Sequence, residues 1–133
     1  MHRILQPEGW AKPRGYANGV SARGRTICLA GQIGWDRDGR FVSDDLVEQT
    51  AQALRNIVEI LACDGARPEH IVNLIWFLAD RREYGARLGE IGVVYRDIVG
   101  RHFPAMSAVQ VAGLVEDRAK VEIQATAIVP DQA

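Results

Sequence analysis

The chain has 133 residues, of which 47% are hydrophobic and 25% are charged, and its formal net charge at pH 7 is -1. This length is enough for one domain with its own core, so residues 1–133 are predicted to form a single domain that needs no disulfide or metal to fold. The nearly neutral charge gives no electrostatic reason to expect a nucleic-acid or membrane partner. The N-terminus has no long apolar run, and Cys28 and Cys63 form no CxxC pair, so we expect a cytoplasmic protein with buried, inert thiols.

The first half of the chain is predicted to contain two strands and a long helix. Residues 1–15 show no periodicity and are expected to be irregular or to hold a short edge strand. Strands are predicted over residues 16–22 and 25–30, with a tight turn at Arg23-Gly24 between them. The second strand is apolar on both sides, which favours a central position in a sheet.

An amphipathic helix is predicted between Leu46 and Leu61, where apolar residues recur at helical spacing. Its candidate N-caps are Ser43, Asp44 and Asp45, the last of these in a capping box with Glu48. Gly65 is the expected C-terminal cap, and Pro68 prevents the helix from continuing.

The second half of the chain is predicted to hold a strand, a second helix and two further strands. Residues 71–78 are apolar on both alternations apart from Asn73, as in a strand that is buried on two faces. Residues 84–98 carry apolar side chains at helical spacing, and glycines among them indicate close backbone packing or a bare surface. Strands are predicted over residues 107–112 and 119–129, the latter with clean alternation.

The predicted order is strand, strand, helix, strand, helix, strand, strand. We therefore expect an α+β fold, a single two-layer domain with one mixed β-sheet and two helices on one face. The other face of the sheet is also rather apolar, and a two-layer domain has no element of its own to cover it. The sequence therefore predicts an oligomer.

Short segments in a fixed order, spread over nearly the whole chain, resemble the YjgF/RidA family of reactive-intermediate deaminases. The matching segments are Gly15-Tyr16, Leu29-Ala30-Gly31-Gln32, Glu48-Gln49-Thr50, Trp76-Phe77-Leu78-Ala79-Asp80, Phe103-Pro104-Ala105 and Val121-Glu122-Ile123-Gln124-Ala125. The resemblance implies a chorismate-mutase-like fold and a homotrimer with a small-molecule pocket at each subunit interface. No cofactor is expected, and His2, His70 and His102 lack the spacing of metal ligands.

The resemblance also assigns positions to the family's site residues. The pocket tyrosine of the family falls on Tyr16, and an asparagine of its second helix falls near Gly92. Its carboxylate-binding arginine falls on Met106, and the glutamate of its last strand, which helps to place a proton or water, falls on Gln124. The implied site has Tyr16 and Gln124 as catalytic residues and, for substrate binding, Gly31, Gln32, Gly92, Pro104, Ala105, Met106 and Ser107.

Two of these exchanges alter the chemistry of the implied site. Arginine gives a carboxylate a bidentate, charge-assisted grip that methionine cannot offer, and the glutamine amide exchanges no proton near neutral pH. Met106 either lines an apolar ligand pocket or packs at an interface, and Gln124 either orients water or ligand or satisfies a neighbour's backbone. Four residues are alternatives for the missing arginine: Arg14, Arg96, Arg101 and His102.

Two functions of different classes follow. The first is hydrolysis of an imine, an enamine or a related small metabolite that lacks the usual carboxylate, with little or no deamination of simple 2-iminoacids. The second is a non-catalytic homotrimer that binds a small ligand or a protein partner in the same clefts. The family also carries the name endoribonuclease, but no basic stripe and no evident acid–base pair in this sequence favour that activity.

Overall fold

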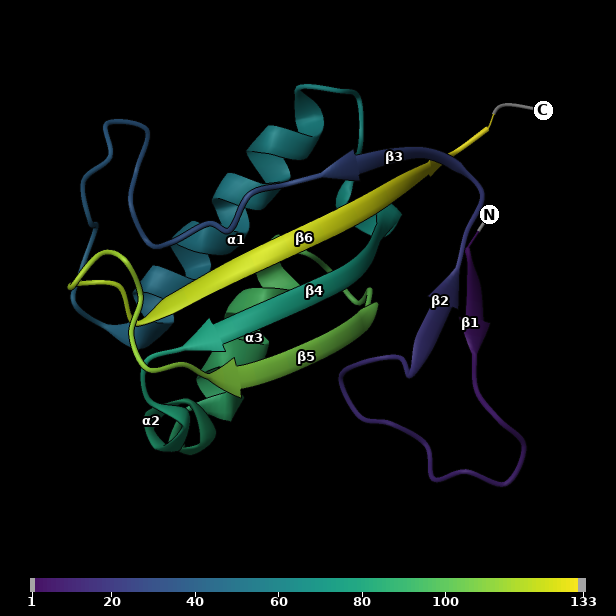
Figure 1. Ribbon diagram of the computed structural model, residues 1–133, viewed down its shortest axis with the longest axis horizontal. Helices are drawn as coiled ribbons and strands as arrows, with labels where there is room; N and C mark the ends of the chain where they lie inside the picture. The colour runs from purple at the N-terminus through teal and green to yellow at the C-terminus, as the bar shows by residue number, and fades with distance from the viewer. Residues whose placement is uncertain (1, 132–133) are drawn as a thin grey trace.

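The protein folds into two layers, a four-stranded sheet and a set of helices that lies against one of its faces (Figure 1). A computed structural model describes residues 2–131. The main elements are β3 (Gly24–Cys28), α1 (Leu46–Ala62), β4 (Ile71–Leu78), α2 (Arg81–Ala86), α3 (Leu88–Ile98), β5 (Ala105–Gln110) and β6 (Val121–Pro130). The predicted α+β class and the order of the elements are confirmed.

The sheet is mixed and has the strand order β3-β6-β4-β5. β6 runs antiparallel to β3 and β4, whereas β4 and β5 are parallel and are connected through α2 and α3. Alternate residues of β4 and β6 are buried against the helices and form the core together with one face of α1. β4 occupies the predicted residues 71–78. β3 and β5 are the two edge strands of this sheet, so the expected central position of the strand over residues 25–30 is wrong.

α1 begins where the sequence predicts. The Asp45 carboxylate accepts the backbone N–H of Glu48 at 3.1 Å, so Asp45 is the N-cap among the candidates. Ser43 supports this cap, because its hydroxyl accepts the N–H of Asp45 at 2.9 Å. At the other end, Gly65 has φ 70°, a left-handed conformation that glycine adopts without strain, and a short 3-10 helix follows at Pro68–His70.

Two polar residues of α1, Gln49 and Thr50, are fully buried. The Gln49 amide donates to the carbonyls of Ser43 at 2.9 Å and Arg118 at 3.0 Å, and it accepts the N–H of Lys120 at 2.8 Å. The Thr50 hydroxyl donates to a carbonyl one turn earlier in α1. Gln49 thereby ties α1 to the segment that leads into β6, and these hydrogen bonds offset the cost of burying its amide.

The N-terminal part of the chain differs from the prediction. β1 (Arg3–Leu5) pairs with β2 (Gly19–Ser21) in a separate two-stranded antiparallel sheet. The predicted strand over residues 16–22 is therefore short and lies outside the main sheet. A single parallel bridge between Ala17 and Ala105 connects this segment to the edge of β5.

The second predicted helix is in fact two helices, α2 and α3, because Arg87 leaves the helical conformation with φ -116° and ψ 19°. Gly85 and Gly89 flank this break, and glycine is a weak helix former. The Arg87 guanidinium instead pairs with Asp45, the N-cap of α1, and with Glu90 of α3. Within residues 2–131, no helix is both long and apolar enough to cross a membrane.

The sheet face that points away from the helices is not covered by any other element among residues 2–131 (Figure 1). Its apolar side chains include Ile75 and Phe77 of β4, which are half-buried, and Val109 of β5, which is 46% exposed. The expectation of buried thiols is wrong, since Cys28 and Cys63 are both exposed and free.

Candidate functional site

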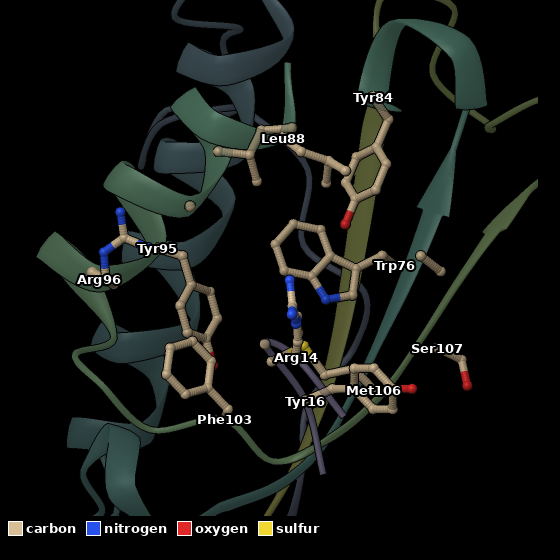
Figure 2. A pocket seen from close by; sticks show the side chains of 14 residues that line it. Arg14, Tyr16, Trp76, Tyr84, Leu88, Tyr95, Arg96, Phe103, Met106 and Ser107 are labelled. Carbon is tan, nitrogen blue, oxygen red and sulfur yellow. The ribbon is translucent and has the colours of Figure 1, made fainter. Parts of the chain in front are cut away.

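A pocket of about 520 Å³ lies beside the edge strand β5, between α3 and the segment that precedes β2 (Figure 2). Its lining is mainly apolar, with a few polar groups. The lining residues are Arg14, Gly15, Tyr16, Trp76, Tyr84, Leu88, Ile91, Gly92, Tyr95, Arg96, Phe103, Met106, Ser107 and Ala108. Such a concave, mostly apolar site with few polar groups is the usual form of a small-molecule site.

The turn at Pro104 fixes the position of the pocket. Pro104 is fully buried, and its carbonyl accepts the N–H of Ala17 at 3.0 Å. The side-chain amide of Asn73 donates to the Ala105 carbonyl at 3.1 Å, which holds the start of β5 against β4. These contacts place Tyr16, which is 43% exposed, next to the start of β5. Pro104 and Ala105 therefore shape the site without lining its pocket.

The register of β5 directs Met106 to the helix side of the sheet. Met106 lies opposite Leu74, which is fully buried, and it packs against the core. On this side Met106 is joined by Tyr16 and Gly92, and Ser107 also lines the pocket. Four of the predicted site residues therefore belong to one pocket.

Gln124 lies on the opposite face of the sheet. It pairs with Ile75, whose side chain points away from the helices, and its own side chain is exposed. The predicted cleft between Met106 and Gln124 is therefore not formed within a single chain, because the sheet separates the two side chains. Periodicity alone did not reveal this, since the faces depend on the pairing register.

Gly31 and Gln32 belong to the same end of the sheet as Gln124. Gln32 forms a backbone bridge with Ile123 of β6. A Cβ atom on Gly31 would lie 2.7 Å from Cδ of Glu122, so the Glu122 side chain occupies the space that the glycine leaves. Glu122 shares the open face with Gln124 and brings a carboxylate next to it. The sequence interpretation did not single out Glu122, although its position two residues before Gln124 on an alternating strand was a usable signal.

An aromatic wall forms one side of the pocket. Tyr95 stacks on Phe103 with ring centroids 5.5 Å apart, and Trp76 lies 6.4 Å from Tyr95 and 6.1 Å from Tyr84. Burial raises the pKa of Tyr84 and that of Tyr95, so both phenols stay protonated at physiological pH. Trp76 was predicted as a strand residue and Tyr84 and Tyr95 as helix residues, and their place in a pocket follows from the fold.

His102 has a structural position. Its Nε2 donates to the Ile71 carbonyl at 2.7 Å, and its own carbonyl accepts the Tyr95 hydroxyl at 2.5 Å. His102 does not line the pocket, and neither does Arg101. Of the four candidates for the missing arginine, Arg14 and Arg96 line it. Among residues 2–131, no three His, Cys, Asp or Glu side chains are grouped so as to hold a metal ion.

The family described as Endoribonuclease L-PSP matches residues 10–129. The 2-iminobutanoate/2-iminopropanoate deaminase of Homo sapiens is 36% identical over 105 residues, which cover 78% of this chain and 73% of that relative. A RutC family protein of Pyrococcus horikoshii is 33% identical over 129 residues, which cover 96% of this chain and 98% of that relative. A solved structure from Yersinia pestis, a protein of unknown function of the conserved Rid protein family, has a TM-score of 0.85 at 32% identity and covers 96% of this chain and 98% of its own.

An α+β domain with an apolar, tyrosine-bearing pocket at the edge of its sheet is a domain of the small-ligand-binding class. The similarities in sequence and structure are more specific. The chain belongs to the Endoribonuclease L-PSP family, which is the YjgF/RidA family, and relatives in it are named imine deaminases.

Proposed function

We propose that this protein is a homotrimer that binds a small metabolite in clefts between its subunits and hydrolyses an imine or enamine there. The observation that carries the proposal is the separation of the site into two halves on opposite faces of the sheet. Tyr16 and Met106 lie on the helix side, whereas Gln124, with Gly31 and Glu122, lies on the open face. One cleft contains both halves only if a second subunit supplies the other half.

The uncovered sheet face supports the same assembly. Ile75, Phe77 and Val109 form an apolar area that a second copy of the chain would cover. β5 is one of the two edge strands, and past its first residue it has no further strand partner on its outer side among residues 2–131. We expect light scattering on the purified protein to give the mass of a trimer. A monomer at micromolar concentration would contradict this part of the proposal.

Hydrolysis of an imine requires a proton on the nitrogen and water at the carbon. Water adds to the carbon and loses one proton to a base while the nitrogen gains one. The resulting hydroxyl then passes its proton to the nitrogen as the C=O bond forms, the C–N bond breaks and the amine leaves. In the proposed cleft, Tyr16 donates a hydrogen bond to the nitrogen and Gln124 of the partner subunit orients the water. Glu122, next to Gln124 on the open face, adds a carboxylate that can accept the proton of the water.

The proposed substrate differs from a simple 2-iminoacid. Met106 stands where the resemblance places a carboxylate-binding arginine, and its thioether provides only apolar contact. We therefore propose a substrate without a carboxylate next to the imine carbon. Weak turnover of 2-iminopropanoate is the expected result, although relatives carry that substrate in their name. The exposed free thiols fit the reducing cytoplasm as its location.

A non-catalytic ligand-binding trimer is the second candidate. The observation that favours it is Gln124, which has no titratable group in the position assigned to proton transfer. The two candidates share the pocket and the assembly, and they differ only in turnover.

The experiment measures the disappearance of imines that a flavin-dependent amine oxidase generates in situ from primary amines, which gives imines without a carboxylate, through competition with semicarbazide as a trapping reagent. The enzyme hypothesis predicts faster loss of a bulky imine with wild-type protein than with Tyr16→Phe, while Val115→Ala, a change at a 97% exposed residue outside the pocket, behaves as wild type. Equal rates with and without the protein for every imine would contradict the enzyme hypothesis and favour the non-catalytic ligand-binding trimer.

A further inference from the structure

We propose that the pocket takes an amphipathic acid, whose aromatic or bulky apolar body lies on the aromatic wall and whose anionic group is held by Arg96. This inference rests on the proposed function and specifies its ligand class. The anionic group of this ligand lies on the side of the pocket that α3 forms (Figure 2). The carboxylate of a small 2-iminoacid would instead lie at Met106.

Arg96 lies over a glycine that leaves room for it. A Cβ atom on Gly92, one turn earlier in α3, would lie 3.2 Å from Nη1 of Arg96 and 3.9 Å from both Cζ and Nη2. The whole guanidinium therefore rests on the bare backbone of Gly92, and both residues line the pocket. Gly89 provides a contrast on the same helix, since a Cβ there would meet nothing within 4 Å.

Within residues 2–131, no ion pair compensates the positive charge at the pocket. Arg25, Arg67, Arg87 and Arg118 each have an acidic partner among the described ion pairs. For residues 2–131, no such pair includes Arg96, and the second pocket arginine, Arg14, also has none. The pocket lining contains no carboxylate. Two arginines beside an apolar wall therefore favour an anion, because low local polarity strengthens the attraction.

The rest of the lining determines the body of the ligand. Trp76, Tyr84, Tyr95 and Phe103 form a continuous aromatic surface, and Met106 also lines the space, which has a volume of about 520 Å³. A two- or three-carbon acid would leave most of this surface uncovered. An aromatic ring or a branched apolar group would fill it and gain favourable ring–ring and thioether contacts.

The test compares three probes by calorimetry at low salt: 3-phenylpropionate, its uncharged analogue 3-phenylpropionamide, and propionate. We expect the wild-type protein to bind 3-phenylpropionate about tenfold or more tightly than the amide, because charge-assisted hydrogen bonds to arginine are the stronger kind. Propionate should bind more weakly than 3-phenylpropionate, because it lacks the ring. Equal affinities for acid and amide would overturn the inference, as would equal affinities for the two acids.

Variants locate the charge. Arg96→Gln should bring the acid-to-amide preference close to one, Arg14→Gln should lower it in part, and Arg101→Gln, an exposed arginine outside the pocket, should leave it unchanged. Gly92→Ala should lower the affinity for 3-phenylpropionate but not for the amide, whereas Gly89→Ala should change neither affinity. An unchanged preference in Arg96→Gln would overturn the inference, whatever the result with Arg14→Gln.

The outcome is separate from that of the proposed function. Binding requires no turnover, so a protein that hydrolyses no imine still gives a definite result with these probes. Conversely, hydrolysis of neutral imines without any preference for the acid would support the proposed function and overturn this inference alone.

Discussion

Replacing Gln49 with leucine tests how the fold holds α1 against the start of β6. Leucine has a similar size but leaves the carbonyls of Ser43 and Arg118 and the N–H of Lys120 without the partner that Gln49 now provides. These three hydrogen bonds are part-buried, and each one that is lost costs about 0.5–1.5 kcal/mol. Burial of the leucine methyl groups offsets part of this, so we expect a loss of about 2–3 kcal/mol, a substantial share of the roughly 5–15 kcal/mol that stabilises a typical domain.

The assay is urea unfolding at a fixed protein concentration, because the stability of an oligomer depends on concentration. Gln52→Leu on the same helix is the matched control. Gln52 is only half-buried and its amide bonds one side chain, Asn56, so its loss should cost about 1 kcal/mol or less. A loss below about 1 kcal/mol for Gln49→Leu, or equal losses for the two variants, would show that the Gln49 hydrogen bonds do not hold α1 in place.

Three further predictions concern the two halves of the site and the segment between α1 and β4. Met106→Arg should raise the affinity for a small carboxylate such as pyruvate about tenfold by calorimetry, because arginine binds carboxylates through charge-assisted bonds, and no gain would mean that Met106 is closed off from ligands. Gly31→Ala should destabilise the protein by about 1 kcal/mol or more by displacing the Glu122 side chain, and the double variant with Glu122→Ala should recover most of that loss; purely additive effects would contradict the contact. Burial lowers the pKa of His70, whose Nδ1 accepts the N–H of Arg67 at 3.0 Å, so the unfolded chain takes up the proton first and Tm should fall as pH drops below about 6.5; His70→Gln should flatten that slope, and an unchanged slope would exclude His70 as its source.

Local signals in the sequence were sufficient for most of the fold. The apolar run of β4, the helical spacing of α1, its cap at Asp45 and its end at Gly65 are properties of neighbouring residues, and the structure agrees with each of them. The break at Arg87 was not predictable in the same way. It coincides with an ion pair to Asp45, which is distant in sequence.

The arrangement of the candidate site residues was predictable only in part, because the faces of the sheet on which their side chains lie were not known. Tyr16, Gly92 and Met106 share one pocket, whereas Gln124 lies across the sheet from it. A shift of one residue in the pairing of β4 with its neighbours would reverse this arrangement, and no local pattern fixes that register. The selection of Arg96 from several arginines likewise depended on its position over Gly92.

The most direct test of the proposed cleft is a crystal structure of the assembled protein with 3-phenylpropionate bound. We expect a trimer in which the ligand lies in the pocket beside Tyr16 and Met106, with its carboxylate at Arg96 and with Gln124 of the partner subunit facing the same cleft. A trimer whose contacts fill this pocket, or an assembly in which Gln124 of the partner subunit faces solvent far from it, would contradict the central claim that two subunits build one site.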